Sequence, residues 1–202
     1  MVELEGPRHR EERARLSGGV VLETDRLRLR RFVLEDAPQL ARLDADAAVR
    51  RYVGSTPPPT ESDYHETILP RWISHYAEGP FGYWCAEVDG DFVGWFHLRP
   101  DRERHGAQDL GYRLVREVWG QGLATEGGRA LVAAGFDEWG ARTITAHCLA
   151  ANLASARVLE KCGLSFVREF VVPERILPGT PAEFRRARAY ELGLDVYRAA
   201  RI

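Results

Sequence analysis

Hydrophobic and polar positions follow two different periods along this chain, and each period predicts one kind of element. Strict alternation over residues 26–30 predicts a strand with one solvated face. Two aromatic and β-branched runs, Phe81–Val88 and Phe92–Leu98, are joined by Asp89-Gly90, a combination that predicts a β-hairpin. Further strands are expected over residues 109–115, 143–149, 164–172 and 186–194. The pattern therefore predicts about seven strands.

Apolar residues spaced three or four apart predict about four helices between these strands. Residues 34–53 have such a pattern, and Asp36 can cap the start of that helix. A second helix follows over residues 61–76, in which Pro70 predicts a kink or a break. The last two helices are Leu123–Trp139 and Asn152–Cys162. Elements in this order, without a repeat or a linker, predict one α+β domain with a mixed sheet.

The composition of the 202 residues is that of a globular protein, with 45% hydrophobic and 29% charged residues. A net charge of −2 argues against a dedicated nucleic-acid-binding protein, and no apolar run approaches the roughly 18 residues of a membrane span. Residues 1–17 mix arginine with glutamate and lack an apolar segment, unlike a secretory signal peptide. We expect a cytoplasmic protein with a flexible extension over residues 1–19 and one domain over residues 20–202.

The three cysteines, Cys85, Cys148 and Cys162, are far apart in the sequence and lie in apolar or helical patterns. Their placement predicts buried free thiols instead of a disulfide framework. The six histidines show no metal-ligand spacing with the cysteines. The sequence therefore predicts no metal site.

A glycine-containing turn, Trp119–Glu126, separates a predicted strand from a predicted helix. The first amides of such a helix have no intrahelical partner, and together with the helix dipole they attract anions. Gly120 and Gly122 let a phosphate approach the backbone because neither has a Cβ. The turn lacks the motif of a nucleoside-triphosphatase loop and the three-glycine spacing of a dinucleotide fingerprint. A phosphate site and a plain glycine turn both fit these residues.

A second motif, Asn152–Leu164, begins about thirty residues after the turn, beyond one helix and one strand. With Gly111-Tyr112 and Trp119–Glu126, it resembles the GNAT superfamily of N-acetyltransferases, and more narrowly the branch of ribosomal-protein N-terminal alanine acetyltransferases. The resemblance extends over residues 20–197. It implies a single-domain GNAT-like fold, with a mixed, largely antiparallel sheet whose central parallel strands splay apart.

The resemblance further implies that acetyl-CoA binds as co-substrate in the wedge between the strands at residues 109–115 and 143–149. The family's phosphate-loop motif, Gln/Arg-x-x-Gly-x-Gly/Ala, corresponds to Trp119, Gly122 and Ala124, with Trp119 in place of the usual polar residue. By the same analogy, the amide of Leu114 would stabilise the thioester oxyanion. The residues implied to contact the cofactor are Leu114, Trp119, Gly120, Gln121, Gly122, Leu123, Ala124, Thr125, Asn152 and Ser155.

Three side chains are candidates for catalytic roles, and each also has a structural interpretation. Asp109 lies where the family often has a glutamate and would act as the base, directly or through water; an ion-paired carboxylate fits equally well. Glu87 and Glu126 are reserve candidates for the base. Asn152 would contact the pantetheine arm or the amine, cap its helix, or do both. Ser155 would protonate the leaving thiolate, or be an ordinary polar helix residue.

The sequence thus predicts an acetyl-CoA-dependent N-acetyltransferase in which an acceptor amine attacks the thioester directly, since no cysteine lies at a recognisable nucleophile position. The acceptor is expected to be a protein N-terminus or a small-molecule amine, with neither nucleic acid nor membrane as a partner. Three alternatives stay open: transfer of another acyl group such as succinyl, a non-catalytic acyl-CoA-binding module, and an unrelated nucleotide-phosphate binder. His97 and His147 lie in predicted strands and are expected to be structural. A homodimer is compatible with the sequence.

Overall fold

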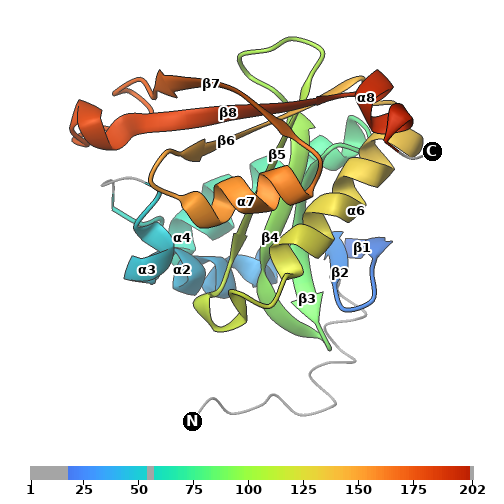
Figure 1. The fold of residues 1–202 in the computed structure, drawn as a ribbon. Helices are drawn as coiled ribbons and strands as arrows, with labels where there is room; N and C mark the ends of the chain where they lie inside the picture. The colour runs from blue at the N-terminus through green and yellow to red at the C-terminus, as the bar shows by residue number, and fades with distance from the viewer. Residues whose placement is uncertain (1–17, 54–56, 201–202) are drawn as a thin grey trace.

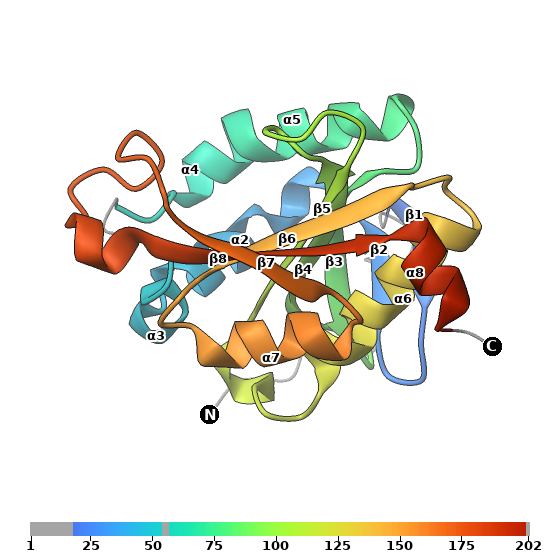
Figure 2. The same ribbon diagram turned by 45° about the horizontal axis from the view of Figure 1, so that its top comes forward.

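In the described part of the chain, one sheet of eight strands organises the fold, and helices pack on both of its faces (Figures 1 and 2). The computed structural model describes residues 18–53 and 57–200. The strand order is β1-β2-β3-β4-β5-β6-β8-β7, and in the described part of the chain neighbouring strands are antiparallel except for β5 and β6. The strands are β1 (Gly18–Glu23), β2 (Arg28–Arg31), β3 (Gly82–Val88), β4 (Asp91–Pro100), β5 (Gln108–Leu114), β6 (Thr143–Leu149), β7 (Ser165–Val171) and β8 (Arg186–Gly193).

The helices form two groups on opposite faces of this sheet. Figure 2 shows α2 to α5 along one face and α6 and α7 along the other. The first group is α2 (Ala37–Ala45), α3 (Ala47–Arg50), α4 (Glu61–Asp63) and α5 (Leu69–Ser74). The second is α6 (Leu123–Asp137) and α7 (Leu153–Lys161), and a short helix, α8 (Leu194–Ala199), follows β8.

The predicted α+β fold is confirmed, and the sheet has one strand more than expected. That strand, β1, begins at Gly18, inside the segment predicted as an extension; residues 1–17 of that segment lie outside the described part of the chain. The turn of the predicted hairpin is present between β3 and β4, where Asp89 and Gly90 both have positive φ values, 51° and 85°. A two-residue turn with this geometry matches the twist of the strands that it joins.

Both predicted helices on the α2–α5 face are present, with irregularities. The first is divided at Asp46, whose side chain accepts hydrogen bonds from amides at the start of α3. The second remains helical from α4 to α5 through a π-helical stretch, Tyr64–Ile68. Pro70 does not break it: the proline directly follows the π-helical stretch, where the amide of Leu69 donates to the carbonyl of Tyr64, five residues back.

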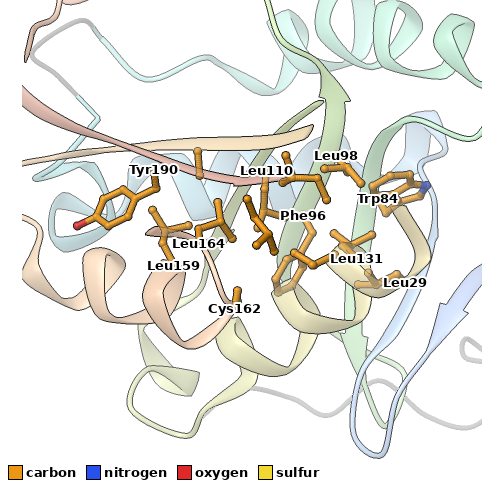
Figure 3. Close-up of a cluster of buried hydrophobic side chains, with 14 of the residues drawn as sticks. Leu29, Trp84, Phe96, Leu98, Leu110, Leu131, Leu159, Cys162, Leu164 and Tyr190 are labelled. Atoms are coloured by element: carbon orange, nitrogen blue, oxygen red, sulfur yellow. The ribbon is translucent and has the colours of Figure 1, made fainter. Parts of the chain in front are cut away.

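Two apolar cores lie on opposite faces of the sheet. The larger core fills the space between the sheet and helices α6 and α7, and its buried side chains include Phe96, Leu110, Leu131 and Leu159 (Figure 3). Gly127 of α6 allows close packing there, because a Cβ at this position would lie 2.5 Å from the ring of Phe96. This core fixes α6, and therefore the turn that precedes α6, against the sheet.

The smaller core, beneath α2 and α5, is rich in aromatic rings. Trp72 of α5 stacks on Tyr83 of β3, with ring centroids 4.2 Å apart, and lies 5.9 Å from the ring of Trp95 in β4. The guanidinium of Arg113 lies 5.1 Å above the ring of Trp95, and it also forms an ion pair with the buried Asp44 of α2. Charged groups are thus enclosed within this side of the molecule.

A second buried ion-pair group lies on the same face and corrects two expectations. Arg30, expected on a solvated strand face, is only 3% exposed. Its guanidinium donates to both carboxylate oxygens of Asp36, at 2.8 and 2.7 Å, and to Glu87 at 2.7 Å. Asp36 therefore binds Arg30 and does not cap α2 with its side chain. Glu87, a reserve candidate for the base, is engaged in the same group.

Candidate active site

The β5 and β6 strands begin side by side and then separate. Their pairing consists of Gln108 with Ile144 and Asp109 with Thr145, although β5 continues to Leu114 and β6 continues for four residues beyond Thr145. Figure 1 shows β6 turning away from β5 beyond this short contact. The predicted splayed pair is therefore present, with its closed end at Asp109.

The register of β5 directs part of its backbone into the gap between the two strands. The amide of Val115 donates to the carbonyl of Val93 in β4, so the residue before it, Leu114, points its own N–H and C=O away from β4. Alternation places the backbone groups of Tyr112 in the same direction. The amide of Leu114 thus faces the gap, at the end of β5 nearest the turn and about 16 Å from Asp109; this position suits the phosphate end of a donor better than the predicted oxyanion role.

The β6 strand presents a matching edge from the other side. The amide of Ala150 donates to the carbonyl of Arg186 in β8, and the pairs alternate along the ladder. The backbone groups of His147 and Leu149 therefore point away from β8 and toward β5. Backbone donors and acceptors need partners, so two facing edges of this kind suit an extended ligand that has amide groups.

The turn before α6 places further backbone donors at the open end of the gap. Gly120 and Gly122 have φ values of 74° and 84°, a conformation that glycine adopts without strain. In the described part of the chain, none of the amides from Gly120 to Thr125 donates a hydrogen bond to another backbone group. The indole N–H of Trp119 donates to the carbonyl of Leu114 at 2.9 Å and so fastens the turn to the end of β5.

Arg26, between β1 and β2, fixes the other side of this turn. Its guanidinium donates to the carbonyl of Gln121 at 2.9 Å and forms an ion pair of 2.5 Å with Glu126, which also accepts from Thr24. A Cβ built on Gly122 would lie 3.6 Å from the same guanidinium. Glu126 is therefore a paired residue of the first turn of α6, and a positive charge that the sequence did not indicate lies beside the phosphate turn.

On the α7 side of the gap, the predicted residues form one hydrogen-bonded group. The side chain of Asn152 accepts from the amide of Ser155 at 3.0 Å, so Asn152 caps α7. The Ser155 hydroxyl lies 3.0 Å from the hydroxyl of Tyr112, which reaches it from β5. Burial raises the pKa of Tyr112 well above its ordinary value, and its proton is therefore retained at neutral pH. The sequence alone did not indicate a tyrosine at this place.

Asp109 lies on the opposite face of the gap, toward α2 and α5, among nitrogen donors. Its Oδ2 atom accepts from Arg99 at 2.5 Å and lies 3.2 Å from Nε2 of His97, while its Oδ1 atom lies 3.7 Å from Nδ1 of His147. Burial alone would raise the pKa of Asp109, but these neighbours outweigh it and hold the pKa well below its usual range. An ionised, ion-paired carboxylate is the state that this environment favours.

Several polar atoms on the same face are buried without a hydrogen-bond partner in the described part of the chain. They include Nε1 of Trp95, Nδ1 of His97 and Nε of Arg99, which belong to alternate residues of β4. Buried polar atoms are normally paired, so a row of unpaired atoms beside Asp109 indicates a place where a polar ligand or water can bind.

The remaining expectations from the sequence concern the cysteines, a metal site and a membrane span. All three cysteines are free and buried, as predicted. Among residues 18–53 and 57–200, no group of three or more histidine, cysteine or acidic side chains is placed to hold a metal ion. Within the same residues, none of the helices is both long and apolar enough to cross a bilayer.

Comparison with known proteins gives one family. A family model described as an acetyltransferase (GNAT) domain matches residues 26–165. The chain is 32% identical over 158 residues to an FsC-acetyl coenzyme A-N(2)-transacetylase of Aspergillus fumigatus; the match covers 74% of this chain and 66%, just under two thirds, of that protein.

Two solved structures show the same fold. RimL, a ribosomal alpha-N-protein acetyltransferase in complex with coenzyme A, is 14% identical with a TM-score of 0.71, over 88% of this chain and 99% of that one. The aminoglycoside acetyltransferase AAC(6')-Ib, also in complex with coenzyme A, is 20% identical with a TM-score of 0.69, over 87% and 99% of the two chains.

Proposed function

Because this chain belongs to the GNAT family of N-acetyltransferases, we propose that it transfers the acetyl group of acetyl-CoA to a primary amine by direct attack. One observation carries the proposal: the free amides of Gly120 to Thr125 lie in one line with the facing edges of β5 and β6, where the carbonyls of Leu114 and Leu149 are already engaged by Trp119 and Asn152. A diphosphate fits the first part of this line, and an amide-containing arm fits the second.

The direction of this line supports a position for the reacting end of the donor. Phosphates at the turn lie beside Leu114, at the open end of the gap, and Asp109 lies at the closed end. Five residues of strand separate the two, about 16 Å at the usual rise. An arm extended along β5 therefore brings its thioester toward Asp109.

The chemistry that we propose uses both faces of the gap. The amine nitrogen forms a bond to the thioester carbon, the carbon–sulfur bond breaks, and the electron pair leaves with the sulfur. On the α7 face, the hydroxyl pair of Tyr112 and Ser155 donates a hydrogen bond to the departing thiolate, which then takes its proton from solvent. On the other face, the negative charge of Asp109 attracts an ammonium group before it loses its proton. Direct attack is supported because Cys85, Cys148 and Cys162 are buried.

The acceptor class that we propose is a primary amine of a small molecule or of a protein N-terminus. The relative at 32% identity is named for transacetylation with acetyl coenzyme A, RimL for a protein terminus, and AAC(6')-Ib for aminoglycosides. A protein terminus and an aminoglycoside differ greatly in size and share only the attacking amine, so we limit the proposed acceptor to a primary amine.

The experiment combines calorimetry with a thiol-release assay over a panel of amines. We expect coenzyme A to bind, and acetyl-CoA to release thiol with at least one amine. Gly122→Trp should abolish binding, since its side chain would fill the space in front of the amides. Gly140→Trp is the matched control: Gly140 also has a positive φ, 76°, and lies beyond the far end of α6.

Each alternative function has its own outcome in this assay. If coenzyme A binds but no amine leads to thiol release, the proposed enzymatic activity is wrong and the protein is a binding module. Tighter binding of ATP than of coenzyme A would overturn the assignment of the phosphate turn. Faster turnover with succinyl-CoA than with acetyl-CoA would show that succinyl, and not acetyl, is the acyl group that the protein transfers.

A further inference from the structure

His147 lies at the closed end of the gap, with its ring held from two sides. It belongs to β6, two residues beyond the last pair with β5, and its Nδ1 atom lies 3.7 Å from Oδ1 of Asp109. Its ring meets that of Phe170 edge-on, with centroids 5.4 Å apart and an interplanar angle of 82°. The side chain is 32% exposed, so the ring is fixed in position yet reachable by a substrate.

The two oxygen atoms of Asp109 have different partners, and this difference determines the state of the ring. Oδ2 is already engaged by Arg99 and His97, whereas Oδ1 faces His147. A carboxylate beside Nδ1 favours the tautomer with the proton on Nδ1, which leaves a lone pair on Nε2. Nε2 is the ring nitrogen that does not face Asp109. His147 is thus prepared to accept a proton at Nε2.

The charged groups around His147 are mostly acidic. The carboxylate of Asp109 raises the pKa of His147 above its ordinary value, and Asp101 and Glu103 in the β4–β5 loop add to this effect. Asp101 also accepts from the hydroxyl of Thr145 at 2.6 Å. On the β8 side, the neighbouring carboxylate of Glu191 is neutralised by its ion pair with Arg104.

These features distinguish His147 from Asp109 as the candidate proton acceptor. A general base is most effective when its pKa lies near the working pH. The ordinary histidine pKa of about 6.5 is already close to neutrality, and the acidic neighbours move it closer. Asp109, whose pKa is held far below neutrality by Arg99 and the two histidines, has little tendency to take a proton.

We infer that His147 is the catalytic base of this site, with Asp109 as the residue that positions it. The inference rests on the proposed function. As the amine nitrogen bonds to the thioester carbon, its proton passes to Nε2 of His147, directly or through one water, and the electron pair of the broken carbon–sulfur bond leaves on sulfur. The imidazolium then returns its proton to solvent, while Asp109 stays ionised throughout.

His97 provides an internal contrast, because it contacts the same carboxylate without access to solvent. Its Nε2 atom lies 3.2 Å from Asp109, and its ring stacks on Trp95 at 5.6 Å. Burial lowers the pKa of His97 below the ordinary value, so this ring is neutral in the working range. Of the two histidines on Asp109, only His147 combines an accessible ring with a raised pKa.

The test measures kcat from about pH 5 to about pH 9, at saturating acetyl-CoA and amine, for the intact chain. For the wild type we expect kcat to fall as the pH drops through the histidine pKa, because protonation removes the base. In His147→Gln this inflection should disappear, and kcat at neutral pH should fall about 100-fold or more. Calorimetry should give the same affinity for coenzyme A in both proteins.

Three further variants keep the experiment decisive. Asp109→Asn should move the inflection to lower pH, since the carboxylate that raises the pKa of His147 is gone; a base at Asp109 would instead give no inflection in this pH range even in the wild type. His65→Gln changes an exposed histidine of the α4–α5 stretch and should leave the profile unchanged. Free imidazole added to His147→Ala should restore part of the rate, which a structural role would not allow.

The outcomes distinguish the inference from the function on which it rests. A wild type that binds coenzyme A but releases no thiol with any amine overturns the proposed function and the base together. A wild type with turnover, whose acidic inflection persists in His147→Gln with less than a threefold loss of kcat, overturns His147 alone. A lower melting temperature for His147→Gln with an unchanged profile would likewise overturn His147 as the base.

Discussion

The two faces of the β5–β6 gap are built differently. On the α6–α7 face, β5 and β6 pack into an apolar core, and the polar groups nearest the gap are the neutral hydroxyls of Tyr112 and Ser155. On the α2–α5 face, charged groups such as Arg30, Asp44 and Asp109 are enclosed, each with a partner of opposite sign. In the proposed acyl transfer, the first face would donate a hydrogen bond to sulfur and the second would accept a proton from nitrogen.

This difference shows how two faces of the same pair of strands can give ionisable side chains opposite preferences. In an apolar surrounding a phenol keeps its proton, because the charged form is poorly solvated. Beside an ion-paired carboxylate, a histidine gains affinity for a proton. The two environments stay distinct because the strands separate the faces.

Removing a buried charge from the α2–α5 face should have the largest effect, and this effect is on stability. Arg30→Met leaves the buried carboxylates of Asp36 and Glu87 without their partner, and we expect the free energy of unfolding to fall by about 3–5 kcal/mol. Urea denaturation measures it. Arg28→Met is the matched control on the same strand, since the side chain of Arg28 is partly exposed; a change within about 0.5 kcal/mol is expected. Equal losses for both variants would contradict the idea that burial sets the difference.

Removing the donor on the α7 face should have an intermediate effect. Tyr112→Phe is expected to lower kcat about tenfold, equal to about 1.4 kcal/mol of barrier, without changing the affinity for coenzyme A. The loss is modest because a thiol with an ordinary pKa near 8.5 leaves well without help.

The partner variant shows whether the two hydroxyls act as a unit. Ser155→Ala should cost a similar factor, and the double variant should be no slower than the slower single variant, because each change interrupts the same pair. Losses that multiply in the double variant would mean that the two groups act separately.

Removing the side-chain cap of α7 should have the smallest effect. Asn152→Ala is expected to lower the free energy of unfolding by about 1 kcal/mol, because the amide of Ser155 loses its acceptor, and Asn152→Ser should keep most of the stability. Melting curves check this expectation. A serine variant that is stable but has a raised KM for acetyl-CoA would show that Asn152 also contacts the co-substrate.

Local patterns predicted the elements well where the chain itself determines the geometry. The Asp89-Gly90 turn and the strand Thr143–Leu149 are present at the predicted residues, and Gly163 at the end of α7 has a φ of 91°, as expected for a left-handed helix end. Each depends on neighbours in the sequence. The strand β1 escaped prediction because its two initial glycines are typical of a flexible segment.

The chemistry of the site was harder to predict because it depends on contacts distant in sequence. Arg30 looked solvated from its alternating strand, yet one of its partners, Glu87, is 57 residues away. His147 looked structural, and only the fold brings it to Asp109. The glycine turn before α6 could be predicted, since a strand followed by glycines and a helix is a local pattern, whereas the pairing of Arg26 with Glu126 could not.

The brevity of the β5–β6 pairing has a mechanical consequence. Two residue pairs form the seam between two half-sheets, β1 to β5 on one side and β6, β8 and β7 on the other. A molecule lying along the free edges would bridge the halves with hydrogen bonds that the chain does not make by itself. At a hundredfold excess over Kd, such a ligand adds about 2.7 kcal/mol to the free energy of unfolding. The heat resistance of this protein would then follow the supply of its thioester donor.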